Sequence, residues 1–118
     1  MTVRGIGMDV IEVVRIRLVR DDLPRFAGRI CTARELAAIG SDPSAQSLAG
    51  RFAAKEAVAK ALGRPLRWHD VEVLPDALGK PVVALSGSAR EVVGGGEVLV
   101  TITHTRTVAA ATALWVEE

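Results

Sequence analysis

The sequence predicts an α+β fold in which a largely antiparallel sheet packs on one central, buried helix. Helix-like segments lie mostly in the first half of the chain, and strand-like segments lie mostly in the second half. Between them, residues 48–62 are apolar or small nearly all round, which is typical of a buried helix. The chain has 118 residues and no linker long enough to divide it, so we expect one domain over residues 1–118.

The chain begins with a predicted strand and a predicted helix. Residues 3–9 form a short apolar segment that ends at Asp9. After it, Ile11, Val14 and Leu18 follow the three- and four-residue spacing of an amphipathic helix. We therefore expect Asp9 to stand where the strand gives way to the helix.

A second short helix is predicted to begin after Thr32 and to extend to residue 39. Glu35 follows Thr32 by three positions, and this spacing is the capping-box pattern of a helix N-terminus. The polar segment 40–47 is expected to be a loop that leads into the central helix.

The central helix is stopped by Gly63, with Pro65 close behind. Turn residues then divide the second half of the chain into short strands and one short helix at about 86–93. The predicted strands are 70–74, 81–85, 97–103 and 107–116.

Composition excludes several classes of protein. The net charge of +1 argues against a broad nucleic-acid-binding surface, and no apolar run is long enough to span a membrane. Cys31 is the only cysteine, so we expect neither an intrachain disulfide nor a cysteine-based metal site. Met1 leads directly into the first strand without a signal peptide, which favours a cytoplasmic protein. With 3% aromatic residues, the core must consist mainly of Val, Leu, Ile and Ala, and so thin a core favours an oligomer.

Positive charge is concentrated in one region of the chain. Between residues 15 and 34 only Asp21 and Asp22 are acidic, whereas six residues are arginines. This excess fits an ordinary solvated helix face or a docking surface for an acidic partner. The arginines are Arg15, Arg17, Arg20, Arg25, Arg29 and Arg34.

The central helix carries charges that a buried helix must neutralise. They are Arg51, Lys55, Glu56 and Lys60. Glu56 and Lys60 are four residues apart, so one interpretation is an ion pair within the helix. The other is a site in which Glu56 and Asp9 bind a cation while Lys60 faces an anion. Two carboxylates suit Mg²⁺, which commonly completes its shell with water and substrate phosphates.

Two further features are weaker signals. Gly5-Ile6-Gly7 lacks the third glycine of a dinucleotide fingerprint, so we interpret these glycines as positions of close backbone packing beside Asp9. His104 ends a predicted strand and has no second histidine at metal-ligand spacing. It fits a structural role or, among neighbouring threonine hydroxyls, a phosphate contact.

Taken in order, these segments resemble the holo-acyl-carrier-protein synthase family of 4′-phosphopantetheinyl transferases. The resemblance spans nearly the whole chain, and five motifs keep the family's order and spacing. They are Gly5–Asp9, Arg51–Gly63, Asp70–Val73, Gly79–Pro81 and Thr101–Thr105.

The resemblance implies a reaction and a set of site residues. Coenzyme A would give its phosphopantetheine to a serine of an acyl carrier protein and release adenosine 3′,5′-bisphosphate. Asp9 and Glu56 would hold Mg²⁺ against the diphosphate, and Lys60 would contact phosphate. The base would be a metal-activated water or an acid at the metal. The positions that would surround the nucleotide are Arg51, Gly63, His104 and Thr105.

The family also implies partners. It forms homotrimers with each active site between two subunits, and its carrier proteins, which serve fatty-acid or polyketide synthesis, are acidic. The family's docking arginines correspond to Arg15, Arg25 and Arg29. This implication favours the docking surface over a merely solvated face.

The chain departs from the family pattern near the nucleotide. After Gly63 the glycine-containing loop is shortened, and the segment Ser41–Ser47 lacks the basic residues that relatives place against the 3′-phosphate. Thr101 replaces a serine and keeps the hydroxyl. The arginines that could substitute for the missing charge are Arg64, Arg67 and Arg106.

Two other functions remain open at this point. Altered loops around a degenerate coenzyme A pocket would fit a non-catalytic module that binds carrier proteins. The same two carboxylates would also fit a metal-dependent hydrolase of a small diphosphate.

Overall fold

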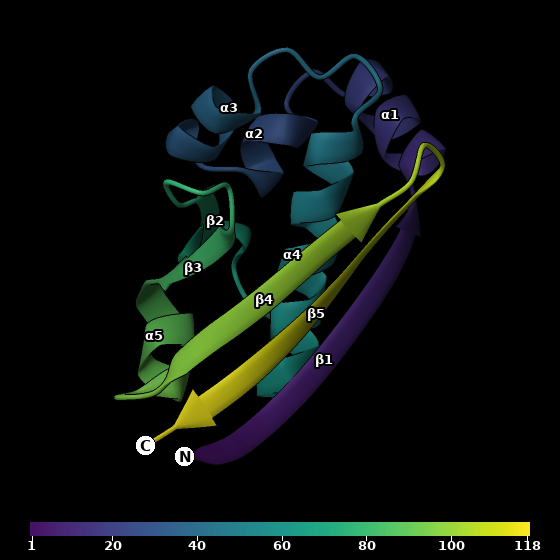
Figure 1. Ribbon diagram of the computed structural model, residues 1–118. Helices are drawn as coiled ribbons and strands as arrows, with labels where there is room; N and C mark the ends of the chain where they lie inside the picture. Colours follow the sequence, from purple (N-terminus) through teal and green to yellow (C-terminus); the bar gives the residue numbers. More distant parts are fainter.

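A computed structural model describes residues 1–118, and its longest helix, α4, lies against a three-stranded sheet (Figure 1). The strands are β1 (Thr2–Glu12), β2 (Val71–Pro75), β3 (Pro81–Leu85), β4 (Glu97–His104) and β5 (Val108–Glu117). The helices are α1 (Val13–Asp22), α2 (Phe26–Ile30), α3 (Ala33–Ile39), α4 (Gln46–Leu62) and α5 (Gly87–Val93), with a single 3₁₀ turn, η1 (Trp68–Asp70).

All strand pairs are antiparallel, which confirms the predicted fold class, but the strands form two separate sheets. β5 lies between β1 and β4, with Asp9 opposite Ala111 and Ala111 opposite Ile102. β2 and β3 form a two-stranded sheet of their own. In Figure 1 this small sheet and α5 lie on one side of α4, while β1 lies on the other.

Small residues let α4 occupy the centre. Its buried positions are mostly alanine, and the core around it is built from Val, Leu, Ile, Ala and the single cysteine, as the low aromatic content predicts. The helix ends at Gly63, which adopts the left-handed conformation with φ of 75°. No helix of the chain is both long and apolar enough to cross a membrane.

Gly5 and Gly7 bring β1 into direct contact with the backbone of α4. A Cβ atom added at Gly7 would meet the Ala57 carbonyl oxygen, the backbone nitrogen of Ala61 at 2.6 Å and the Lys60 Cβ at 2.9 Å. A Cβ atom at Gly5 would meet the Ala61 carbonyl in the same way. The predicted close packing beside Asp9 is therefore confirmed.

Local signals explain some of the shorter elements but not all of them. The capping box of α3 is present, because Glu35 N–H donates to Thr32 Oγ1 while Glu35 Oε1 accepts from Thr32 N–H. The helix predicted from Ile11 begins only at Val13, since Ile11 pairs with Ala109 in the sheet. α2 and η1 were not predicted.

Candidate functional site

The first part of the site lies where β1 crosses α4. Lys60 Nζ is 3.1 Å from Asp9 Oδ1 and also donates to the Met8 carbonyl at 2.9 Å. The Asp9 side chain is 17% exposed and the Lys60 side chain is 55% exposed. An acid and an amine thus meet at the protein surface, within reach of a ligand.

Glu56 lies beside the same crossing. Along β1, Gly5 contacts Ala61 of α4 and Gly7 contacts Ala57, so the strand and the helix run in opposite directions. Asp9 lies about 7 Å further along the strand, which corresponds to about one more helical turn and brings Asp9 beside the turn that carries Glu56. The Glu56 carboxylate is half-buried and has no hydrogen-bond or ion-pair partner in the chain.

The intrahelical ion pair considered from the sequence is therefore not formed. Lys60 is four residues from Glu56, as that interpretation required, but it pairs with Asp9 of β1 instead. Helical spacing alone could not reveal this partner, because it comes from a strand more than 40 residues away in sequence.

A cavity of about 460 Å³ opens beside Glu56 and Lys60. We call it the first cavity. Its polar side chains come from α4 and from the segment that follows the helix, including Arg64 and Arg67. Its walls are apolar at Ala59, Pro65, Leu66, Trp68 and Val71, and Gly63 lies at its edge.

The donor set fits a hard divalent cation whose shell is completed by substrate. No cluster of three or more His, Cys, Asp and Glu side chains could hold a metal by itself. Glu56 lines the first cavity and is unpaired, and Asp9, which does not line it, adds a second carboxylate beside Lys60. Mg²⁺ is commonly held by one or two carboxylates together with water and phosphate oxygens, so these residues fit that ion.

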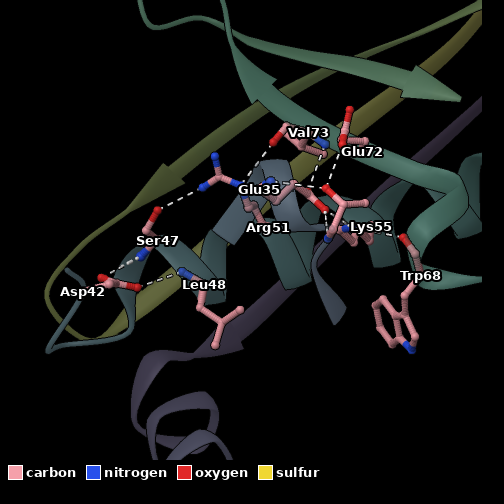
Figure 2. Close-up of polar contacts among 10 residues, drawn as sticks. Glu35, Asp42, Ser47, Leu48, Arg51, Lys55, Trp68, Glu72 and Val73 are labelled. Carbon is pink, nitrogen blue, oxygen red and sulfur yellow. Dashed lines mark hydrogen bonds and ion pairs between the residues drawn. The ribbon is translucent and has the colours of Figure 1, made fainter. Parts of the chain in front are cut away.

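A second cavity, of about 340 Å³, lies near the N-terminus of α4 and contains two of the predicted nucleotide residues. Arg51 and His104 both line it, together with Ser47, Gly50 and others from β2 and β3. His104 is exposed at the end of β4, where the sequence placed it. The Nε and Nη1 edge of the Arg51 guanidinium is held by hydrogen bonds to the Val73 carbonyl and Ser47 Oγ (Figure 2).

The two cavities lie on opposite faces of α4. Arg51 and Lys60 are separated by nine residues, which is about 13 Å of rise and about two and a half turns of helix. The structure thus brings Glu56, Lys60 and Gly63 to the first cavity, but it brings Arg51 and His104 to the second. Within one chain, the predicted site residues do not form a single site.

Thr105 lines neither cavity. Its hydroxyl accepts hydrogen bonds from the backbone N–H groups of Thr107 and Val108, so it shapes the turn between β4 and β5. Its carbonyl accepts from Gln46 Nε2 at 3.3 Å, and Gln46 does line the second cavity. Arg106 follows in the same turn, whereas Arg64 and Arg67 line the first cavity.

All three predicted docking arginines have free side chains. Arg15, Arg25 and Arg29 are exposed and make no hydrogen bond or ion pair through their side chains. Arg25 and Arg29 line a further cavity of about 360 Å³ with apolar walls from Leu23, Pro24 and Phe26. Arg20, by contrast, donates to the carbonyl groups of Asp42 and Pro43 and so anchors the loop before α4.

Sequence reasoning missed the buried partner of the charges on α4. Lys55 Nζ lies 2.7 Å from Glu35 Oε1, and Arg51 Nε lies 3.9 Å from Glu35 Oε2 (Figure 2). The capping box singled out Glu35, and the buried helix implied a counter-charge, but nothing in the sequence joined the two. Next to Glu35, burial raises the pKa of the Cys31 thiol to about 11, and the Glu35 charge adds to the increase.

Known proteins resemble this chain in sequence and in fold. A profile of the 4′-phosphopantetheinyl transferase superfamily matches residues 5–111. A holo-[acyl-carrier-protein] synthase of Alkaliphilus metalliredigens is 40% identical over 121 residues, covering 95% of this chain and 98% of that protein. The crystal structure of holo-ACP-synthase from Plasmodium yoelii matches this chain with a TM-score of 0.89 at 31% identity, and the match covers 99% of this chain and 97% of the Plasmodium chain. A holo-(acyl-carrier-protein) synthase from Bacillus anthracis, in complex with CoA (3′,5′-ADP), has a TM-score of 0.79 at 31% identity, with 98% and 97% covered.

Proposed function

This chain belongs to the holo-acyl-carrier-protein synthase family of 4′-phosphopantetheinyl transferases, and from that premise we propose that it modifies an acyl carrier protein with the phosphopantetheine of coenzyme A. The serine hydroxyl of the apo carrier loses its proton to a general base, and its oxygen forms a bond to the phosphorus that bears the pantetheine arm. The bond from that phosphorus to the leaving oxygen breaks, and adenosine 3′,5′-bisphosphate departs. Residues 1–118 would act as one catalytic domain.

The observation that carries this proposal is the Asp9–Lys60 pair beside the unpaired Glu56 at the first cavity. Asp9 and Glu56 would hold Mg²⁺ together with the diphosphate. Bound there, the ion supplies Lewis-acid polarisation of the phosphoryl oxygens. Lys60 is more than half exposed, so its ammonium can turn from Asp9 toward a phosphoryl oxygen and offset the negative charge that develops during transfer.

We further propose that each active site is completed by a second copy of the chain in a homotrimer. The division of the site residues between two cavities supports this, because Arg51 and His104 do not line the first cavity of their own chain and a second copy could supply them to it. An exposed apolar sheet face provides a surface for association. Ile6 and Met8 on β1 are 67% and 58% exposed, and Leu99 on β4 is also exposed.

A mixing experiment tests the shared site. Glu56→Gln should remove the metal ligand at the first cavity, and His104→Ala should remove the nucleotide contact at the second. Each variant alone should therefore be nearly inactive. When the two are unfolded together and refolded, mixed oligomers should regain part of the wild-type turnover, because some interfaces contain neither substitution. Mixed oligomers that form, as shown by mass spectrometry, but regain no turnover would contradict the shared site.

The carrier is proposed to dock on α1 and α2. Arg25 and Arg29 line an apolar cavity, and Arg15 is exposed on α1. These three unpaired positive charges and the apolar walls are complementary to an acidic helix with a few apolar side chains. The carrier would belong to fatty-acid or polyketide synthesis. A cytoplasmic location is part of the proposal and is supported by Cys31, which is buried as a free thiol.

The transfer itself is tested by weighing the carrier. The protein is incubated with coenzyme A, Mg²⁺ and each of a panel of apo carrier proteins, and the expected result is the mass increase of one phosphopantetheine group on one or more carriers. No increase on any carrier would reject the transferase. Consumption of coenzyme A without carrier would instead indicate the hydrolase, and carrier binding without Mg²⁺-dependent coenzyme A binding would indicate the non-catalytic module.

A further inference from the structure

One carboxylate is completely enclosed where α3, α4 and β2 meet. The Glu35 side chain is 0% exposed. Figure 2 shows the contacts of this carboxylate with α4 and β2. Its Oε1 atom accepts from Thr32 N at 3.0 Å and Lys55 Nζ at 2.7 Å, and its Oε2 atom accepts from Val73 N at 2.9 Å and lies 3.9 Å from Arg51 Nε.

Two cations depend on this single acid. The Lys55 side chain is 1% exposed and the Arg51 side chain is 11% exposed, and Glu35 is the only acidic side chain that forms an ion pair with either of them. A buried cation without a counter-charge is strongly unfavourable. The positions of both cations therefore depend on the charge of Glu35.

The same contacts orient Arg51 toward the second cavity. Its Nε atom donates to the Val73 carbonyl at 3.1 Å and its Nη1 atom donates to Ser47 Oγ at 2.9 Å, while Nη2 has no partner in the chain. Val73 and Ser47 both line the second cavity. One edge of the guanidinium is thus held by protein groups, and the other is left for an anion.

Lys55, one helical turn further along α4 than Arg51, links Glu35 to the first cavity. Its ammonium group donates to the Trp68 carbonyl at 3.0 Å, and Lys55 and Trp68 are both among the residues that line this cavity. Glu35 itself lines neither cavity. Glu35 is connected to the second cavity through Arg51 and to the first cavity through Lys55.

We propose that Glu35 is a positioning residue for coenzyme A, which holds Arg51 in the orientation that binds the nucleotide and braces the wall of the first cavity through Lys55. This inference rests on the proposed function, since that function makes Arg51 a ligand of coenzyme A. The capping box alone does not require the charge, because glutamine serves at that position of a capping box as well as glutamate does. The negative charge is therefore the feature to test.

Glu35→Gln removes the charge and keeps the size, and its single carbonyl oxygen can accept from Thr32 N–H or from Val73 N–H but not from both. We expect the KM for coenzyme A, and its Kd by calorimetry, to rise about tenfold, with kcat within about threefold of wild type. In the Arg51→Gln background the same substitution should raise the KM by a smaller factor, because only the contact through Lys55 is left to lose. The matched control is Glu72→Gln, since Glu72 bonds to Thr32 Oγ1 at 2.7 Å in the same α3–β2 contact but touches neither Arg51 nor Lys55.

Several outcomes would overturn the inference. They are an unchanged KM and Kd in Glu35→Gln, an equal loss in both Arg51 backgrounds, or the same loss in Glu72→Gln. If Glu35→Gln does not fold, the variant with Lys55→Met added removes the unpaired ammonium and is measured in its place. A wild-type chain that binds coenzyme A but modifies no carrier would reject the proposed transfer, while the calorimetric cycle would still decide the role of Glu35.

Discussion

Replacing Gly7 with alanine tests whether the site depends on contact between the backbones of β1 and α4. The new Cβ atom would lie 2.6 Å from the backbone nitrogen of Ala61, where ordinary contacts are 3.4–4 Å. The Ala57 carbonyl oxygen lies closer still, so the strand and helix must separate by more than about 1 Å, and overpacking of this kind costs about 2–3 kcal/mol. For a chain of this length we expect a fall in the melting temperature of roughly 8–12 °C.

The same displacement should impair catalysis. It separates Asp9 from Lys60 and Glu56, and a misplacement of about 1 Å can cost about a hundredfold in rate. Melting is followed by circular dichroism, and turnover is measured well below the lower melting temperature. The stability control is Gly28→Ala in α2, where an added Cβ atom meets nothing within 4 Å and alanine favours the helix. If Gly7→Ala melts within 2–3 °C of wild type, the close packing does not position the site.

Four further substitutions test the metal site, the coenzyme A contact, the pH dependence of stability and the oligomer. Glu56→Gln should abolish Mg²⁺-dependent turnover in the carrier mass assay while the melting temperature stays near that of wild type, because the Glu56 carboxylate bonds to nothing in the chain; full activity would remove Glu56 from the site. Arg106→Gln should raise the KM for coenzyme A about fivefold and leave that for dephospho-coenzyme A unchanged, if Arg106 supplies the charge missing from the loop before α4; an equal effect on both substrates would exclude it. Burial raises the pKa of the Cys31 thiol from 9.0 to about 11, so the unfolded chain loses this proton at a lower pH than the folded chain, and the free energy of unfolding should fall between pH 9 and pH 11. Urea titrations at several pH values should show a smaller fall for a Cys31→Ala variant, and equal falls in the two proteins would refute this. Met8→Glu places charge on the exposed sheet face and should dissociate the oligomer, as measured by light scattering; a wild-type chain that is monomeric would refute the trimer.

The sequence predicted the fold well where one face of an element is buried. The strands at 81–85 and 97–103 alternate between core and surface, and they are observed at Pro81–Leu85 and Glu97–His104. α2 was missed because it has five residues with Gly28 in the middle and so carries no periodicity. Contacts from elsewhere hold it, among them Phe26 against Phe52 at 6.5 Å between ring centroids. Such contacts are not encoded in a local pattern.

The candidate site was predictable in its residues but not in its pairings. The charges of α4 were identified, and their need for partners followed from burial. Their partners, Asp9 for Lys60 and Glu35 for Lys55, lie 51 and 20 residues away in sequence. Only the packing of β1 and α3 on α4 brings them together. The separation of Lys60 and Arg51 into two cavities, by contrast, could have been predicted from the sequence. Their positions are nine residues apart along the helix, and this spacing places two side chains on opposite faces of any α-helix.

The thin core and the location of the site have a common physical origin. Because α4 has alanine or glycine at most contact positions, β1 approaches to the distance at which Gly7 meets the helix backbone. At so short a distance, the long side chains of α4 cannot remain between the layers, so they extend to the edges and meet partners there. Lys60 does this at the Asp9 edge and Arg51 at the edge of β2. Larger side chains on α4 would add apolar burial, but they would also move Asp9 away from Glu56. The stability lost in this thin core can be recovered at the exposed face of the sheet, where association buries Ile6 and Met8 without moving the carboxylates.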